Sequence, residues 1–137
     1  MQDIKNILKE DGIWVLEQSY FPFLLKNVAF DSICHEHLSY FMYKQLKKIL
    51  DNYGLSLIDV SFNSMNGGSF RLFISHKNSD FQVTKRNIKK LEILEKKIFD
   101  NFKFELQKFK KKINFAKSNL FKLLVKAKKN SKVVHLY

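Results

Sequence analysis

The sequence predicts an α/β fold in which a sheet ending in an antiparallel hairpin is followed by a long helical segment. Residues 13–16 (IWVL) form a short apolar run, typical of a strand buried on both faces of a mostly parallel sheet. Residues 55–62 and 69–75 each alternate apolar and polar side chains, and Gly67-Gly68 between them indicates a hairpin turn. From residue 81 to about residue 129, apolar residues recur at helical spacing.

Three shorter helices are predicted before the hairpin. Residues 2–10 place apolar side chains on one helical face and stop at Gly12, and Pro22 indicates a helix that begins near it within residues 20–28. A third helix ends at Gly54 and follows from the spacing of Leu38, Phe41, Leu46, Ile49 and Leu50.

The long C-terminal segment predicts one straight amphipathic helix that packs on a domain. Its apolar seam runs from Ile98 to Ala127 with a period of about 3.6 residues, which would make a helix about 45 Å long. Residues 133–137 have the composition of the beginning of another strand. No other run in the sequence offers a parallel neighbour for residues 13–16, so we expect the sequence to be an interior part of a larger protein.

The composition indicates a folded, cytoplasmic protein that does not span a membrane. With 137 residues, 45% of them hydrophobic, the chain is long enough for a single core, and residues 1–10 lack the apolar run of a signal peptide. No apolar run reaches the roughly 20 residues that cross a bilayer. Cys34 is the single cysteine, so neither an internal disulfide nor a closed zinc site is expected.

The net charge of +12 is concentrated in the C-terminal part of the chain. Residues 1–80 carry eight Lys or Arg against nine Asp or Glu, whereas residues 81–137 carry seventeen against four. Nucleic-acid recognition favours arginine, and only Arg71 and Arg86 occur among 25 basic residues. We therefore favour a lysine-coated helical face and expect no specific nucleic-acid partner.

The densest group of titratable side chains lies in residues 30–41, which read FDSICHEHLSYF. His35 and His37 flank Glu36, and histidine is the side chain that titrates nearest neutral pH. The third predicted helix begins close by, so we expect these residues just before or within a helix N-terminus. The helix dipole there would favour an anionic ligand or the charged form of Glu36.

This block and the hairpin contain motifs in a specific order and spacing. The motif positions are Glu17, Ser19, Tyr20, Phe30, Asp31, Ile33, His35, Glu36, His37, Tyr40, Gly54, Leu55, Gly67, Gly68, Ser69 and Arg71. Together they resemble the S-adenosylmethionine-dependent C-methyltransferases, which methylate a ring carbon of nucleotide-linked deoxy-keto-sugars, and the resemblance covers essentially the whole chain. Cys34 and Asn66 depart from the family pattern, which has a tyrosine and a histidine there, and these departures leave the exact sugar open.

The resemblance implies two domains and their ligands. Residues 1–80 would be the C-terminal part of a class I, Rossmann-like methyltransferase domain, whose sheet ends in the antiparallel pair. Residues 81–137 would be the helical start of a second α/β domain that binds the sugar nucleotide. By the same resemblance, S-adenosylmethionine is bound mainly upstream of this chain, and zinc only in an N-terminal module upstream. The oligomeric state stays open.

The chemistry implied by the resemblance begins with a base. Methylation next to a ketone requires removal of an α-proton to give an enolate, and a neutral histidine, with an ordinary pKa of about 6.5, suits that step. By the resemblance His37 is this base, and Glu36 orients the substrate or a neighbouring imidazole. Substrate contacts are expected from Tyr20, Cys34, Tyr40 and Ser69.

Two other interpretations stay open. Residues 81–137 could form a non-enzymatic basic helical module that binds nucleic acid or an acidic protein partner. The chain could also be a degenerate fragment without activity.

Overall fold

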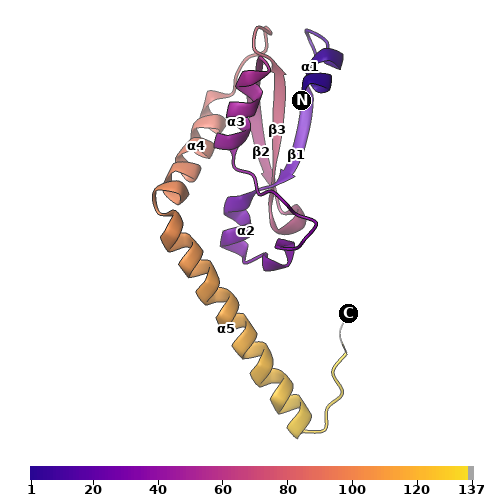
Figure 1. Ribbon diagram of the computed structural model, residues 1–137, viewed down its shortest axis with the longest axis vertical. Helices are drawn as coiled ribbons and strands as arrows, with labels where there is room; N and C mark the ends of the chain where they lie inside the picture. The colour runs from indigo at the N-terminus through magenta and orange to yellow at the C-terminus, as the bar shows by residue number, and fades with distance from the viewer. Residues whose placement is uncertain (136–137) are drawn as a thin grey trace.

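The computed structural model describes residues 1–135 as a three-stranded sheet with helices around it and a long projecting helix (Figure 1). The strands are β1 (Trp14–Ser19), β2 (Leu55–Asn63) and β3 (Ser69–His76). The helices are α1 (Gln2–Ile7), α2 (Phe21–Asn27), α3 (Tyr43–Asn52), α4 (Lys85–Asp100) and α5 (Phe102–Lys129). Two short 3₁₀ turns are η1 (Phe30–Ser32) and η2 (Met65–Gly67).

Strand β3 lies in the centre of the sheet, between β1 and β2, and is antiparallel to both. The predicted hairpin is confirmed, because β2 pairs with β3 from Leu55 opposite His76 to Asn63 opposite Ser69. Residues 13–16 were expected to lack a parallel neighbour in this sequence, and among the described residues β1 pairs only with β3, in the antiparallel direction. A local apolar run does not encode the direction of a partner strand that is distant in sequence.

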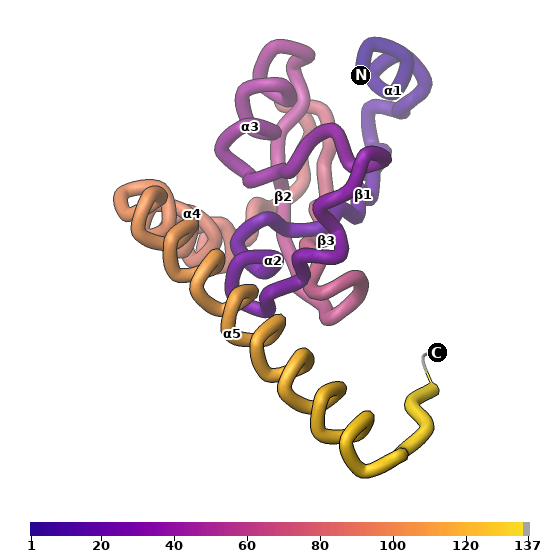
Figure 2. Tube along the Cα trace, turned by 60° about the horizontal axis from the view of Figure 1, so that its bottom comes forward, coloured from indigo at the N-terminus to yellow at the C-terminus, as the bar shows by residue number. Residues whose placement is uncertain are grey.

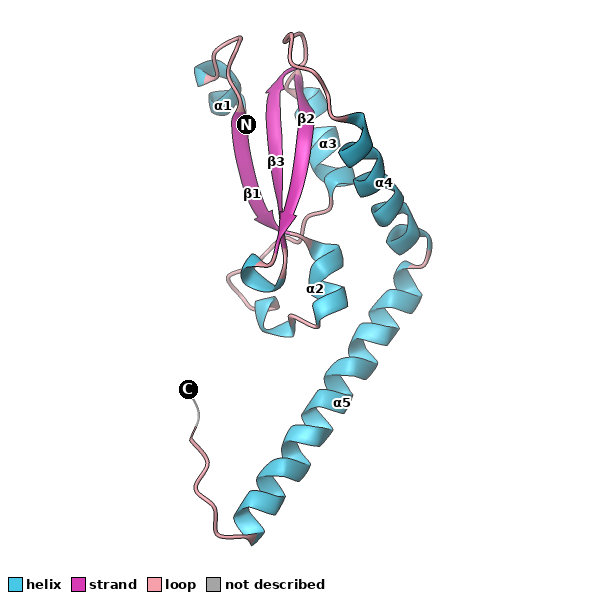
Figure 3. Ribbon diagram, turned by 180° about the vertical axis from the view of Figure 1, so that it is seen from behind, coloured by secondary structure: helices cyan, strands magenta, loops and turns pink. Residues whose placement is uncertain are grey.

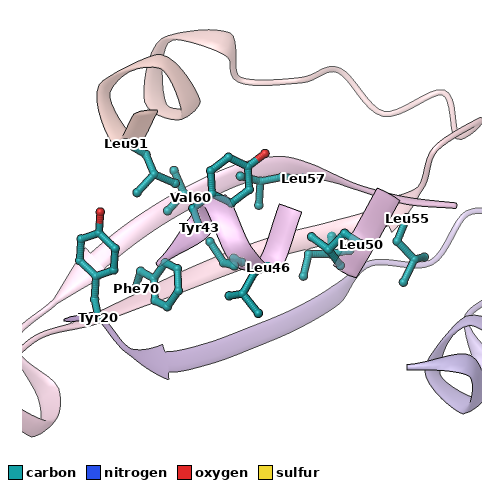
Figure 4. Packing of buried hydrophobic residues seen from close by; sticks show 11 residues of the cluster. Tyr20, Tyr43, Leu46, Leu50, Leu55, Leu57, Val60, Phe70 and Leu91 are labelled. Atoms are coloured by element: carbon teal, nitrogen blue, oxygen red, sulfur yellow. The ribbon is translucent and has the colours of Figure 1, made fainter. Parts of the chain in front are cut away.

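The main core lies between the sheet and the helices α3 and α4 (Figure 4). In β3, the alternating residues Phe70, Leu72 and Ile74 are each 0% exposed, as expected of a central strand that is covered on this face. Burying a side chain of this size contributes roughly 1.5–3 kcal/mol. The buried cluster consists of Tyr20, Tyr43, Leu46, Leu50, Leu55, Leu57, Val60, Phe70, Leu72, Ile74 and Leu91.

The three predicted short helices are present, with shifted boundaries. Helix α1 ends at Ile7, and α2 has Pro22 in its first turn, where a missing backbone N–H costs nothing. Helix α3 begins only at Tyr43, so of the two expected placements, just before or within a helix N-terminus, the second is wrong for His35, Glu36 and His37. These three residues lie in the exposed loop that precedes α3.

The predicted single straight helix is two helices that meet at Asn101. The backbone of Asn101 has φ −118° and ψ 27°, which interrupts the helix between α4 and α5. Helix α4 packs along β2 and α3, and the first half of α5 packs on α2 (Figure 2). The second half of α5 projects away from the rest of the protein (Figure 3).

The predicted strand at residues 133–137 is not found in its described part. Residues 132–135 have no regular secondary structure, and the remainder of that prediction lies outside the described residues.

Within residues 1–135, no helix combines the length and the apolar character that a membrane span requires. The same part of the chain contains no group of three or more His, Cys, Asp or Glu side chains placed to share a metal ion.

Candidate functional site

The carboxyl end of β1 and the turn between β2 and β3 lie at the same end of the sheet (Figure 1). The backbone N–H of Tyr20 donates to the carbonyl oxygen of Gly68 at 3.0 Å. The turn is seated directly on α2, because a Cβ atom at Gly68 would lie only 2.6 Å from the Cβ atom of Phe23. Gly68 also has φ +122°, so this position requires glycine for two reasons. The backbone beyond β1 is therefore fixed by the turn.

Residues 34–40, here called the site segment, form an exposed loop that contains the predicted catalytic residues. Its C-terminal end is attached to the start of α2, where the Phe21 N–H donates to the Phe41 carbonyl oxygen at 3.1 Å. The rings of Phe21 and Tyr40 add a contact, with 6.0 Å between their centroids. The site segment is therefore anchored to the same end of the sheet as the hairpin turn.

The imidazole of His37 is oriented by the backbone of Ser32. The His37 Nδ1 atom lies 2.9 Å from the Ser32 carbonyl oxygen. A carbonyl oxygen only accepts hydrogen bonds, so Nδ1 must carry the proton and donate it. In the neutral ring, Nε2 is then unprotonated and can accept a proton. Tyr40 donates its hydroxyl to the same Ser32 oxygen at 3.2 Å.

The other predicted residues of the site segment are exposed to solvent. The side chains of His35 and Glu36 are 92% and 75% exposed, and the Nε2 atom of His35 lies 4.0 Å from the Oε1 atom of Glu36. Cys34 is an exposed free thiol. An exposed ion pair at this distance contributes little to stability, so neither His35 nor Glu36 holds the fold together.

Two of the predicted substrate-binding residues are buried. Tyr20 is 0% exposed, and its hydroxyl has no hydrogen-bond partner among the described residues. Ser69 is 2% exposed and donates its hydroxyl to the Met65 carbonyl oxygen at 3.0 Å, which closes the hairpin turn. The structure thus brings Tyr20 and Ser69 to the end of the sheet where the site segment is anchored, but it engages Ser69 within the turn. Their substrate contacts stay predictions.

Two residues of the sequence motif, Glu17 and Arg71, form an ion pair across β1 and β3. Arg71 donates from Nε at 2.9 Å and from Nη2 at 2.7 Å to one carboxylate oxygen of Glu17. Asn63 donates to the other oxygen at 2.9 Å. The hydrogen bonds from Asn63 and Arg71 hold the pKa of Glu17 below its usual value. Each carboxylate oxygen accepts at least one hydrogen bond, so Glu17 links β1 to β3 through Arg71 and to β2 through Asn63.

The sequence analysis missed Glu95, a buried carboxylate at the N-terminus of α3. Its two oxygens accept the backbone N–H groups of Tyr43 and Lys44, the first two residues of the helix. The helix dipole predicted to stabilise Glu36 therefore stabilises Glu95. The signal was present in the sequence, because Glu95 interrupts the helical apolar row of Leu91 and Ile98.

Burial and these two hydrogen bonds act in opposite directions on the pKa of Glu95. Glu95 is 4% exposed, and burial raises its pKa, while the backbone N–H groups of Lys44 and Tyr43 oppose the rise. Burial also raises the pKa of Tyr20, and the nearby charge of Glu95 raises it further. The phenol of Tyr20 is therefore uncharged at neutral pH.

Comparisons with known proteins identify similar sequences. The family model of the C-methyltransferase C-terminal domain matches residues 64–137. C-methyltransferase NovU of Streptomyces niveus is 35% identical over 83 residues, which are 61% of this chain and 20% of that protein. The chain thus spans about a fifth of the length of this curated relative.

Proposed function

The chain belongs to the C-methyltransferase family, and from this we propose that it contributes the proton-abstracting part of an enzyme that methylates sugar carbon. The substrate of the proposal is a nucleotide-linked deoxy-keto-sugar, and the methyl group enters at a ring carbon next to the ketone. The proposal goes beyond the family in naming the substrate class, the base and the order of events.

The hydrogen bond between His37 and Ser32 is the observation that carries this proposal. It leaves Nε2 of a neutral ring free to accept a proton, on an exposed segment at the carboxyl end of a strand. Ligands in open α/β sheets bind beyond the carboxyl ends of strands. A base that is oriented through its other ring nitrogen is a common arrangement for catalytic histidines.

In the proposed step, Nε2 of His37 takes the α-proton of the keto-sugar. The electron pair of the broken C–H bond forms the enolate, and the ring becomes an imidazolium with a proton on each nitrogen. The Ser32 carbonyl continues to accept from Nδ1, and this bond strengthens because its donor is now charged. The enolate carbon is the nucleophile that C-methylation requires.

The methyl donor implied by the family is S-adenosylmethionine, and the described residues do not fit as its main binding site. A glycine-rich loop between a strand and a helix is the usual cradle for such a cofactor. Here β1 leads into α2 through Tyr20-Phe21-Pro22, and the glycines Gly67 and Gly68 form the hairpin turn. We propose that residues outside this sequence hold the cofactor.

The test replaces His37 by asparagine in the intact enzyme and measures exchange of solvent deuterium into the keto-sugar without cofactor. Exchange reports proton abstraction alone. We expect His37→Asn to lower it about 10²- to 10⁴-fold, the usual effect of losing a general base.

His35→Asn is the matched control, because the His35 side chain is 92% exposed and makes no hydrogen bond to Ser32 in the described part of the chain. It should keep most of the exchange. Undiminished exchange in the His37 variant would remove the base assignment, and loss of exchange in the His35 variant alone would move it to His35.

We also propose that residues 81–137 begin a second α/β domain that packs against the projecting half of α5. The apolar seam of α5 continues there with Leu120 and Leu124, which are 54% and 38% exposed. In the intact enzyme, backbone amides of residues 116–129 should exchange with solvent more slowly than in the 137-residue chain. Equal exchange rates in both proteins would contradict this packing.

A further inference from the structure

Glu95 connects the helix α4 to the start of α3 from inside the core. Its side chain is 4% exposed, and one oxygen accepts the Lys44 N–H at 2.9 Å while the other accepts the Tyr43 N–H. These N–H groups have no partner within α3, because the first four N–H groups of a helix lack one. Glu95 therefore satisfies two helix N-terminal donors, one buried and one partly buried, with one side chain.

The start of α3 is also the place where the site segment returns to the core. Met42 is the N-cap of α3 and does not cap it with its own side chain. Just before it, Phe41 forms a bridge with Tyr20 and accepts the Phe21 N–H. Fixing residues 42–44 therefore fixes the C-terminal end of the site segment.

A continuous set of contacts leads from this point to the imidazole of His37. Phe21 holds Phe41 by a hydrogen bond and Tyr40 by ring contact. Tyr40 and His37 then share the carbonyl oxygen of Ser32 as their acceptor. Residues 34–40 are all exposed, so the core does not hold the middle of the site segment. Its conformation depends on the contacts at its ends and on the hydrogen bonds to the Ser32 carbonyl oxygen.

We propose that Glu95 is a positioning residue for His37: by fixing the start of α3, it holds the site segment so that Nδ1 stays bonded to Ser32 and Nε2 stays free. The proposal rests on the proposed role of His37 as the base. It assigns to α4, which lies in the part matched by the C-terminal domain family, a role in the chemistry of the preceding segment.

Glu95→Gln is an informative substitution because glutamine has nearly the shape of glutamate but only one acceptor oxygen. Its oxygen can accept one of the two N–H groups, while its amide nitrogen is a donor and would face the other. The charged and titratable groups around Glu95 are the Tyr20 hydroxyl, Tyr43, Lys44 and Lys47 from α3, and Glu92, Lys96 and Asp100 from α4. Glu95→Gln replaces none of these residues.

The experiment compares the wild-type chain with Glu95→Gln and with Glu92→Gln, which removes an exposed carboxylate from the same helix. Long-range ¹H–¹⁵N correlation spectra at about pH 8, above the ordinary histidine pKa, report which nitrogen of His37 is protonated. Hydrogen exchange reports the Tyr43 and Lys44 amides. These readouts do not depend on enzymatic activity, so they fail or succeed separately from the proposed function.

We expect His37 to be protonated on Nδ1 in the wild type and in Glu92→Gln. In Glu95→Gln, the Nδ1–H form should lose its predominance, and the Tyr43 and Lys44 amides should exchange about 10-fold faster or more, as for the loss of hydrogen bonds to a charged group. In the intact enzyme, kcat should fall with little change in KM.

Three results would overturn the proposal. An unchanged His37 tautomer beside faster amide exchange would mean that Glu95 only caps α3. A wild-type His37 without Nδ1–H would remove its premise. Glu95→Asp, which keeps the charge but has a shorter reach, replaces the glutamine variant if that variant unfolds. Unfolding of both, with Glu92→Gln folded, would show that Glu95 holds the whole core and not the site segment.

Discussion

The carbonyl oxygen of Ser32 accepts hydrogen bonds from two side chains, His37 at 2.9 Å and Tyr40 at 3.2 Å. These two bonds use the full capacity of a carbonyl oxygen. Tyr40 has a single hydroxyl proton, so while it donates to Ser32 it cannot donate to another acceptor, although its oxygen can still accept a hydrogen bond. If the proposed function holds, we expect Tyr40 to accept a hydrogen bond from a sugar hydroxyl and not to protonate the enolate.

Glu95 should make the stability of the protein depend on pH. Its folded pKa is raised by burial, so its contribution to the free energy of unfolding is fully present below the ordinary value of 4.5 and is lost as pH rises through the raised value. We expect Glu95→Gln to lower the free energy of unfolding more at about pH 4.5 than at about pH 8. Urea unfolding of both proteins at several pH values measures this difference.

The control for this measurement is Glu92→Gln, which also removes one negative charge from α4 but at an exposed position. Because the charge of Glu92 also helps to raise the pKa of Glu95, we expect Glu92→Gln to weaken this pH dependence without abolishing it. If Glu95→Gln instead lowers the free energy of unfolding more at high pH than at low pH, the two backbone hydrogen bonds outweigh burial and lower the pKa of Glu95.

At the scale of elements, the hairpin turn fits α2 only because Gly68 has no side chain. We expect Gly68→Ala to lower the free energy of unfolding by about 2–4 kcal/mol, since it adds a contact of 2.6 Å with Phe23 to a backbone with φ +122°. Gly54→Ala separates the two causes. Gly54 has φ +68° but its Cβ would meet only the Lys5 Nζ atom at 3.9 Å, so about 1–2 kcal/mol of backbone strain is expected there. If Gly68→Ala and Gly54→Ala lower the free energy of unfolding equally, α2 shifts away from the added methyl group of residue 68 without a further loss of stability.

Helix α5 has a packed half and a projecting half, and its phenylalanines distinguish them. Phe109 is 7% exposed and packs with Leu24 and Leu25, so Phe109→Ala should lower the free energy of unfolding by about 2–4 kcal/mol. Phe115 is 69% exposed, and Phe115→Ala should change it by less than about 0.5 kcal/mol. Chemical denaturation of the two variants provides the comparison. A large cost at Phe115 would show that another part of the protein or a second copy covers it.

At the scale of the whole molecule, positive charge is concentrated in the C-terminal part of the chain. The excess lies in residues 81–137, with seventeen basic against four acidic residues, and the projecting half of α5 carries several of these lysines into solvent. The charge is carried by lysine side chains, which attract phosphate without reading bases.

We therefore expect weak binding to DNA or RNA that has no sequence preference and falls steeply with salt. Counterion release is the driving force that such a surface offers, and it is strongly reduced by about 200 mM salt. Titration of two unrelated DNA duplexes over a range of salt concentrations measures both properties. A sequence-selective complex that survives about 200 mM salt would favour the non-enzymatic binding module instead.

The sequence by itself determined the elements whose causes are local. Apolar alternation and Gly67-Gly68 determined the hairpin, Pro22 the start of α2, and helical spacing the long C-terminal segment. The motif order determined the family, which the comparisons bear out. In each case the information lies in the spacing of neighbouring residues.

The tertiary structure decided what depends on residues far apart in sequence. The antiparallel pairing of β1 with β3, the break at Asn101 and the use of the α3 N-terminus by Glu95 follow from how the elements pack. A buried carboxylate inside an apolar row is unfavourable unless hydrogen-bond donors meet it. Here the donors are the backbone N–H groups of Tyr43 and Lys44, which lie 52 and 51 residues earlier in the chain. Local spacing contains no record of such a partner, so only the folded chain places it.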